Sequence, residues 1–237
     1  MSKTLLLAVI FGCVVTAGCA ATNTVSRGNQ LMQSGRYSEA ITTYEKVLKD
    51  SNDYYGLLNK GIAEWRIKEY EKALHSFTEA IKAKPGNSSL AYYYRAEIYF
   101  KMHNYKEAFK DVNKAIKQDP LNVYALNLRG RINTIEERYS DAINDFSTAV
   151  ELDGESNVSG YIYHNRAIVY IAREDYESAI HDYENYIRFL KKHSLPVTSE
   201  DNYLLEVLRY ATGNSENTPL ISGKISSEDK GKNNANF

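Results

Sequence analysis

The sequence is poor in cysteine and proline and has no excess of either charge. Its 237 residues include 2 Cys, 4 Pro and 1 Trp, and 29 Lys and Arg balance 30 Asp and Glu to give a formal net charge of −1. Without net positive charge the chain has no long-range attraction to nucleic acid, so we expect no nucleic-acid partner. A content of 43% hydrophobic and 25% charged residues is that of an ordinary folded protein and excludes global disorder.

Motifs for catalysis and metal binding are also missing from the sequence. The five histidines form no HExxH motif and no cysteine-histidine cluster with metal spacing, and no P-loop, GxGxxG or GxSxG occurs. The carboxylates recur with a repeat period, which indicates a role in the fold rather than a single acid-base pair. We therefore predict a protein that is not an enzyme and that has no cofactor and no metal site.

A short apolar segment lies at the amino terminus. Met1, Ser2 and Lys3 form a positive region, and an uninterrupted run of apolar or small residues extends from Leu5 to Val15. A helix of about 11 residues measures roughly 16 Å, which is well short of the ~30 Å core of a bilayer. The segment 1–18 is therefore expected to be a signal peptide rather than a membrane-spanning helix.

The run is followed by Thr16-Ala17-Gly18-Cys19, which resembles the lipobox of bacterial lipoproteins. In that family cleavage leaves the cysteine first and lipid is attached to its sulfur. Cys13 would leave with the signal peptide, so Cys19 would have no intramolecular disulfide partner. Since Ala20 follows the cysteine, the resemblance implies a lipid anchor in the outer membrane, facing the periplasm, if the source is Gram-negative. The alternative is an ordinary cleavage site without lipid, which would release a secreted protein.

A short pattern that begins with tyrosine and has alanine in its fourth place occurs five times. The alanines are about 33 to 37 residues apart, within the range of known helical repeats. Aromatic or aliphatic residues follow each alanine after four positions and mostly again after three more, which is the spacing of one helix face. Twelve residues before each alanine stands a small residue. The tyrosines, alanines and small residues are Tyr37, Tyr70, Tyr105, Tyr139 and Tyr176; Ala40, Ala73, Ala108, Ala142 and Ala179; and Gly28, Gly61, Ala96, Gly130 and Ala167.

This period and pattern resemble tetratricopeptide repeats, and the resemblance implies an all-α fold, a right-handed α-solenoid of about five helix-turn-helix repeats. We place the array at 19–212, with repeats at about 21–53, 54–88, 89–122, 123–159 and 160–196. An amphipathic segment follows Pro196, and at about 199–212 it is expected to form a capping helix over the open end of the stack. The polar segment 213–237 is predicted to be a disordered tail.

Arginine and aspartate recur 16 positions apart in three successive repeats. That spacing can place one charge on each helix of a hairpin. We favour an ion pair that holds the two helices together over a ladder of charges for a ligand. Lys60 and Ser76 occupy the same positions in the second repeat and break the pattern. The three pairs are Arg95 with Asp111, Arg129 with Asp145, and Arg166 with Asp182.

The tetratricopeptide resemblance also implies a concave groove lined by the first helix of each repeat. The positions that commonly face it are aromatic in this chain, and the cluster of Lys, Arg and Asn that grips a terminal carboxylate in some such domains is absent. Aromatic side chains are enriched in protein interfaces, so we predict a groove for a partner segment. Packing against neighbouring repeats is the alternative for any one residue. The predicted groove residues are Tyr55, Leu58, Ile62, Trp65, Tyr93, Glu97, Phe100, Tyr124, Asn127, Arg131, Tyr161 and His164.

These features predict a non-catalytic, lipid-anchored docking scaffold in the bacterial cell envelope. Its partner would be a protein or peptide segment of the envelope, and its membrane contact would be the lipid on Cys19. Similar repeat lipoproteins assist assembly of the secretins of type IV pili and secretion systems, or bring cell-wall hydrolases and proteases together, and the sequence does not choose between these roles. An unlipidated secreted binding protein or enzyme is a further alternative.

Overall fold

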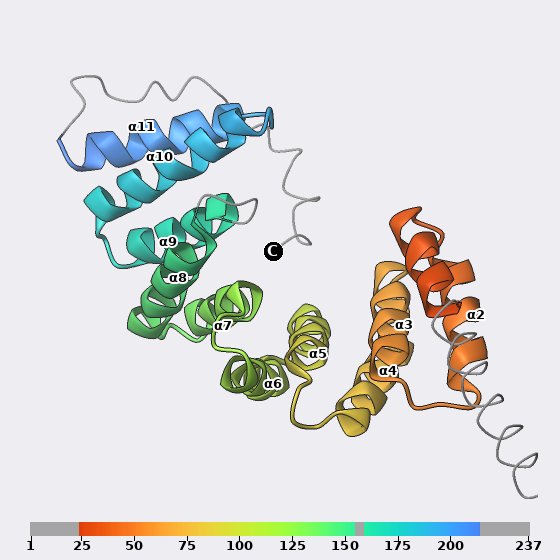
Figure 1. The fold of residues 1–237 in the computed structure, drawn as a ribbon. Coiled ribbons are helices and arrows are strands. Elements are labelled where there is room, and N and C mark those ends of the chain that lie inside the picture. Colours follow the sequence, from red (N-terminus) through yellow and green to blue (C-terminus); the bar gives the residue numbers. More distant parts are fainter. Residues whose placement is uncertain (1–23, 155–158, 214–237) are drawn as a thin grey trace, which may run out of the picture. The chain divides into compact units, whose positions relative to one another are not determined.

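The computed structural model describes residues 24–154 and 159–213. The predicted signal peptide, Cys19 and all but the first residue of the predicted tail lie outside these ranges. All regular structure in the described ranges is helical: residues 24–33 followed by α2 (Tyr37–Leu48), α3 (Tyr54–Arg66), α4 (Tyr70–Ala83), α5 (Ser89–Lys101), α6 (Tyr105–Gln118), α7 (Val123–Ile135), α8 (Tyr139–Asp153), α9 (Ser159–Ala172), α10 (Tyr176–Lys192) and α11 (Ser199–Ala211) (Figure 1). Successive helices pack pairwise, which confirms the predicted all-α fold of stacked helix-turn-helix repeats.

The chain divides after Asp153 into two compact units. The amino-terminal unit contains the helical residues 24–33 and helices α2 to α8, and the carboxy-terminal unit contains α9, α10 and α11. None of the described helices is both long enough and apolar enough to cross a membrane.

Each pair of helices in the amino-terminal unit packs through a small residue facing a larger side chain. In three repeats the small residue is glycine and the side chain is an aromatic ring 16 positions later. A Cβ atom added at Gly28, Gly61 or Gly130 would lie 2.4, 2.7 or 2.6 Å from the ring of Tyr44, Phe77 or Phe146, respectively. The glycines are therefore required by the close approach of the two helices, because a methyl group would occupy the space of the ring.

The turn within each pair has the same left-handed backbone position in all five repeats. The residue there has a φ between 57° and 71° and is followed two positions later by the repeat tyrosine. Its N–H and the next N–H donate to the last carbonyls of the preceding helix, as in a Schellman cap. Only the first repeat has glycine at this position, although glycine adopts it without a steric penalty. The five residues are Gly35, Lys68, His103, Glu137 and Glu174.

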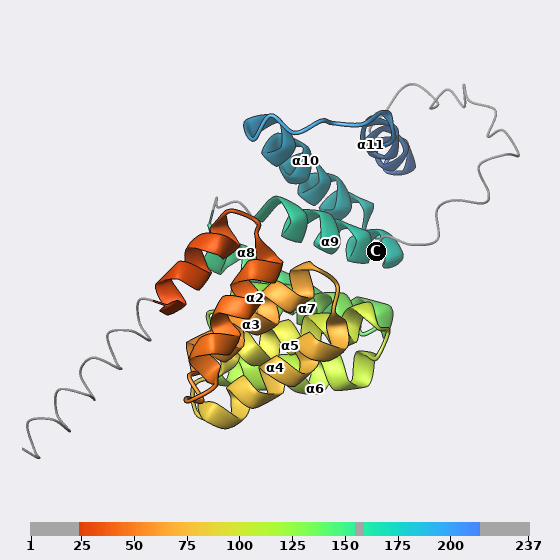
Figure 2. The same cartoon turned by 90° about the vertical axis from the view of Figure 1, so that its right-hand side faces the viewer.

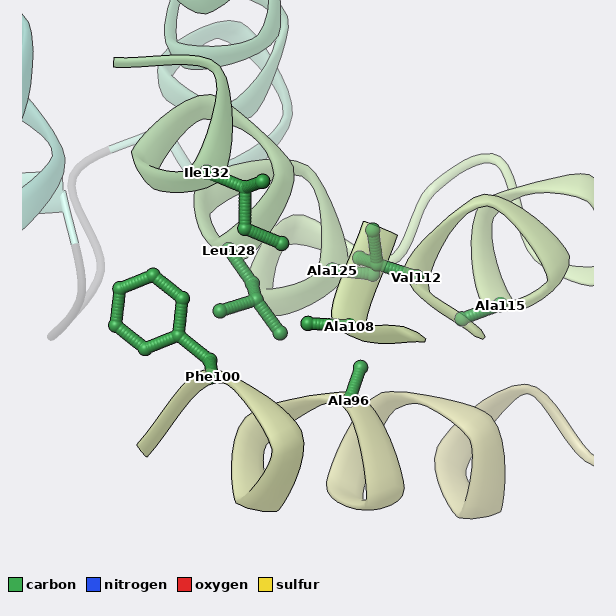
Figure 3. Packing of buried hydrophobic residues seen from close by; sticks show 8 residues of the cluster. All are labelled: Ala96, Phe100, Ala108, Val112, Ala115, Ala125, Leu128 and Ile132. Atoms are coloured by element: carbon green, nitrogen blue, oxygen red, sulfur yellow. The ribbon is translucent and has the colours of Figure 1, made fainter. Parts of the chain in front are cut away.

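The hydrophobic core of the amino-terminal unit runs between its helices. One cluster is formed where α5, α6 and α7 meet, and Figure 3 shows Phe100 of α5 lying toward Leu128 and Ile132 of α7. Ala96 and Ala108 belong to the same cluster, and both are fully buried. The small side chains let α5 and α6 approach, while the large ones fill the space between successive first helices.

The carboxy-terminal unit is a helix pair covered by a third helix. Tyr183 and Ile187 of α10 form its core with Ala167 of α9, and Leu204 and Leu205 of α11 pack against them. The start of α11 is fixed by a capping box between Thr198 and Asp201. The Asp201 carboxylate also accepts a hydrogen bond from the Tyr183 hydroxyl at 2.7 Å. Helix α11 thus packs on α10 through both apolar and polar contacts.

Candidate functional site

The first helices of successive repeats in the amino-terminal unit lie side by side. Helix α3 contacts α5, and α5 contacts α7, in addition to the contacts of each with its own second helix (Figure 2). Side chains at equivalent positions of these three helices therefore form rows that cross the helix axes. The surface formed by α3, α5 and α7 is called the first-helix surface below.

A row of exposed apolar side chains lies near the amino-terminal ends of these helices. Tyr55 on α3 and Tyr124 on α7 are 57% and 52% exposed. Leu90 on α5 is 46% exposed and occupies the equivalent position, six residues before the small residue of its repeat. Sequence reasoning selected the two tyrosines and missed Leu90, although the repeat register alone identifies it. We call these three residues the apolar row.

Aromatic side chains form a partly buried cluster beside this row. The Tyr93 ring lies 6.0 Å from that of Tyr124 and 5.1 Å from that of Tyr94. The Tyr94 ring lies 5.8 Å from Trp65 and stacks at 5.6 Å on Phe77 of the helix core. Burial is the main cause that raises the pKa of Tyr93 and Tyr94 above the usual value, so both remain protonated and can donate hydrogen bonds. The contacts of Tyr94 join the surface to the core.

The middle of the first-helix surface contains one acidic and one basic side chain. Glu97 lies 3.4 Å from the hydroxyl of Tyr93, which donates to it, and 3.9 Å from the guanidinium of Arg131. Arg131 also lies over the ring of Phe100, 4.4 Å from its centroid. Asn127 is partly buried on α7. The structure therefore brings Tyr93, Glu97 and Arg131 together.

Two residues expected in the groove are core residues instead. Leu58 is 4% exposed and Phe100 is 7% exposed, and each belongs to a hydrophobic cluster between helices. Their positions on the helix turn them toward the second helix or the next repeat, so they offer little surface to a ligand. Ile62 and Trp65 are intermediate, because both pack against the cluster around Phe77 but are not fully buried.

The remaining two predicted groove residues belong to the carboxy-terminal unit. Tyr161 is 51% exposed and its ring lies edge-on to Phe189 at 5.6 Å. His164 packs 4.8 Å from Tyr186 and 5.9 Å from Tyr183, and burial lowers the pKa of its imidazole. Tyr161 thus presents a surface, whereas His164 lies among aromatic side chains of its own unit.

The arginine-aspartate pairs are intra-repeat ion pairs, as the sequence predicted. Arg95 donates to both oxygens of Asp111 at 2.6 and 2.9 Å, and Arg166 donates to Asp182 at 2.6 and 2.8 Å. Arg129 binds Asp145 in the same way, with distances of 2.6 to 3.1 Å. The aspartates are at most 5% exposed, so these charges stabilise the fold and are not offered to a ligand.

Two of these arginines also contact the preceding repeat. Arg95 donates to the hydroxyl of Thr78 at 2.9 Å, and Arg129 donates to the amide oxygen of Asn113 at 2.9 Å. Thr78 and Asn113 lie on the second helices of the preceding repeats. A single guanidinium therefore joins the two helices of its own repeat to the second helix of the preceding repeat, since it has donors on both edges.

The second repeat builds the same connection from different residues. Its carboxylate is Glu64 on the first helix, which is 1% exposed and lies 2.9 Å from the ammonium of Lys60. Ser76 of the second helix donates to Glu64 at 2.6 Å. The interruption of the sequence pattern at Lys60 and Ser76 is thus a rearranged polar contact, and sequence reasoning missed Glu64 because it lies outside the 16-residue spacing.

Paired helices with one register, small residues at their contacts and a shared turn define a helical-repeat protein. Residues 25–88 and 89–122 match models of the tetratricopeptide repeat, so the chain contains tetratricopeptide repeats. Such repeats form scaffolds for protein or peptide partners.

Similar proteins share the repeats and the fold. Human DnaJ homolog subfamily C member 7 is 29% identical over 170 residues, which are 65% of this chain and 34% of the relative, so the chain spans about a third of that protein. The structure of PilF from Pseudomonas aeruginosa superposes with a TM-score of 0.71 and 15% identity, covering 84% of this chain and 87% of PilF. MamA from Desulfovibrio magneticus RS-1 gives a TM-score of 0.63 at 20% identity, covering 73% of this chain and 96% of that chain.

Proposed function

We propose that the chain is a non-catalytic scaffold, anchored by lipid at Cys19 in the bacterial cell envelope, which binds a segment of a partner protein on its first-helix surface. The observation that carries the proposal is the apolar row of Tyr55, Leu90 and Tyr124, whose side chains are each 46% exposed or more on helices that contact one another. Exposed apolar side chains in one row favour a protein contact over isolated surface residues.

Aromatic side chains suit such a contact physically. They bury a large apolar area, they have few rotors to immobilise, and tyrosine keeps a polar tip that can form hydrogen bonds. The neighbouring cluster of Tyr93, Tyr94 and Trp65 is fixed by ring contacts, so little additional side-chain ordering accompanies binding. The first-helix surface is thus preorganised for a partner segment.

The lipid anchor is supported by the sequence Thr16-Ala17-Gly18-Cys19 after the apolar run. Acyl chains contribute about 0.8 kcal/mol per buried CH₂, so more than one chain on Cys19 would hold the protein firmly to a membrane. Cys19 stands shortly before the helical residues 24–33, and an anchor there would keep the first repeat close to the bilayer. We place the protein at the outer membrane, facing the periplasm.

The anchor is tested by mass spectrometry of the mature protein purified from its native membrane. The expected result is an amino-terminal Cys19 carrying diacylglycerol, and a Cys19→Ser variant that is found in the soluble fraction. An unmodified terminus, or a wild-type protein that leaves the membrane as readily as the variant, would contradict lipid anchoring.

The docking surface is tested by placing the photo-cross-linker benzoylphenylalanine at Tyr55 or at Tyr124 in the full chain. Lys106 is the matched control, because it is exposed but lies on the second helix α6. We expect cross-links to a discrete partner from both first-helix positions and none from Lys106. Equal cross-linking from all three positions, with the far-UV circular dichroism spectrum unchanged, would refute the assignment of this surface.

The similarity to PilF is a similarity of fold and does not choose the partner. Identification of the protein cross-linked at Tyr124 separates the two roles considered for such lipoproteins. A secretin subunit would support a pilotin-type assembly factor, and a cell-wall hydrolase or protease would support an adaptor.

A further inference from the structure

The charges of the amino-terminal unit are divided between its first and second helices. The first helices contain Lys or Arg at several positions, and their only carboxylates are Glu64 and Glu97. The second helices together contain ten Asp and Glu against seven Lys, and the remaining acidic side chains lie in the turns. The difference comes from α8, which contains four Asp and Glu residues and no Lys or Arg. The surface that presents the apolar row is therefore the more basic side of this unit.

Most of the first-helix cations are neutralised by the protein itself. Lys60 pairs with Glu64, and Arg131 lies beside Glu97. Arg95 and Arg129 are held by buried aspartates of their own repeats. Each of these four cations thus has a carboxylate of the chain itself beside it.

Arg66 and Lys101 differ from these four. Both are exposed, at equivalent positions near the carboxy-terminal ends of α3 and α5. Within the ranges that the structure describes, no carboxylate oxygen lies within 4.0 Å of either cation. The guanidinium of Arg66 lies 5.0 Å from the centroid of the Trp65 ring, which orients it along the aromatic cluster. We call Arg66 and Lys101 the basic row.

The basic row and the apolar row lie on the same face of their helices. Arg66 is eleven residues after Tyr55, and Lys101 is eleven residues after Leu90, so each pair is three turns apart on one stripe. At 1.5 Å per residue the two rows are separated by roughly 16 Å along the helix axes. Since α3 and α5 are in contact, the rows run parallel to each other across the two helices. A single protein segment, about 10–12 Å wide as a helix, fits between them with side chains reaching both rows.

We propose that the first-helix surface binds an acidic, amphipathic protein segment. Its apolar side chains contact Tyr55, Leu90 and Tyr124, and its carboxylates contact Arg66 and Lys101. Charge complementarity selects this partner, because no carboxylate of the described residues lies within 4.0 Å of either cation of the basic row. Glu97, one helical turn before Lys101, accepts from Tyr93 and lies 3.9 Å from Arg131 instead, so a basic segment would meet two cations without a carboxylate partner. The inference rests on the proposed function and adds the chemistry of the partner to it.

The test measures fluorescence anisotropy of two labelled peptides with the full chain. The peptides share one pattern of Leu and Phe, and one has Glu at the positions where the other has Lys. We expect the acidic peptide to bind more tightly than the basic one and to weaken as salt is raised. The charge-reversing double variant Arg66→Glu/Lys101→Glu should weaken the acidic peptide by at least about tenfold and should strengthen the basic one.

The matched control is Lys106→Glu/Lys117→Glu, which changes the net charge equally on the exposed side of α6. It should leave both affinities within about twofold of wild type, because its charges lie beyond a Debye length of the bound peptide or are screened by solvent. Equal effects of the two double variants would show a response to net charge alone, and this would overturn the proposal.

Other outcomes also decide against it. Equal affinity for the two peptides, or no binding of the acidic peptide, would refute an acidic partner while leaving the cross-linking test of the docking surface intact. Sedimentation with phosphatidylglycerol vesicles but not with phosphatidylcholine vesicles, dependent on Arg66 and Lys101 and without peptide binding, would assign the basic row to lipid headgroups instead.

Discussion

The packing of Gly130 against Phe146 gives a prediction whose size can be worked out from the structure. A Cβ atom at position 130 would lie 2.6, 2.8 and 2.9 Å from three carbons of the Phe146 ring. The ring is fully buried and cannot move into solvent. Alanine has a helix propensity about 1 kcal/mol better than glycine, whereas overpacking a core destabilises by about 1–3 kcal/mol. We therefore expect Gly130→Ala to destabilise the protein by up to about 2 kcal/mol.

The third repeat shows how this overpacking can be relieved. Ala96 stands at the glycine position there, and the fully buried Val112 replaces the aromatic ring. Phe146→Val alone should destabilise by about 2–4 kcal/mol because it leaves a cavity. In Gly130→Ala/Phe146→Val the new methyl group enters that cavity, so the double variant should be about 1–3 kcal/mol more stable than the sum of the single effects.

The assay is urea unfolding of all four proteins followed by far-UV circular dichroism, with the midpoint and the m-value fitted separately. The control is a mismatched cycle of Gly130→Ala with Phe77→Val, in which the ring belongs to Gly61 of another repeat. The mismatched effects should add to within about 0.5 kcal/mol. Additive effects in the matched cycle as well would show that the two side chains do not compete for one space, and the packing argument would be refuted.

Three further predictions concern the turns, the ion pairs and the last helix. Glu137→Gly should raise stability by about 0.5–1 kcal/mol in thermal unfolding, because Glu137 has a φ of 57°, which favours glycine, and the same change at the helical, exposed Lys106 should lower stability. Asp111→Ala should lower the free energy of urea unfolding by about 3–5 kcal/mol, since it leaves Arg95 partly buried without its carboxylate, and a loss below 1 kcal/mol would contradict this role. Burial alone would raise the pKa of Asp201, but hydrogen bonds from Tyr183 and Thr198 outweigh it and lower the pKa below its usual 3.8. That stabilisation is complete above about pH 5 and is lost as the pH falls through the folded-state pKa. The midpoint temperature of thermal unfolding should therefore fall more steeply in acid for wild type than for Asp201→Asn.

The fold could be predicted because its determinants recur. The repeat alanines and the glycine-aromatic pairs are packing residues, and their spacing on the chain is the spacing of helix contacts. The 16-residue distance from Arg95 to Asp111 is likewise fixed by the length of a helix, a tight turn and a second helix. Such features can be recognised in a single sequence because each of them lies within one helical hairpin.

The candidate site was less predictable, because exposure depends on neighbours outside the hairpin. Leu58 and Phe100 occupy positions that commonly line a groove, but in this chain both side chains are buried in hydrophobic clusters between helices. Glu64 replaces an aspartate of the other helix, which no fixed spacing reveals. Arg66 and Lys101 could not be selected as site residues from the sequence, because they differ from the other first-helix cations only in lacking a carboxylate partner.

The ion pairs also connect the stability of the stack to the geometry of the first-helix surface. Arg95 and Arg129 each bind a second helix of their own repeat and one of the preceding repeat. These contacts set how the first helix of one repeat lies against the next, and this register brings the Tyr93 and Tyr124 rings to 6.0 Å. Loss of Asp145, the carboxylate that binds Arg129, should therefore change more than stability. A variant that remains folded should cross-link less from Tyr124. The reason is that the arginine-aspartate ion pairs, which do not contact the partner, align the apolar row that does.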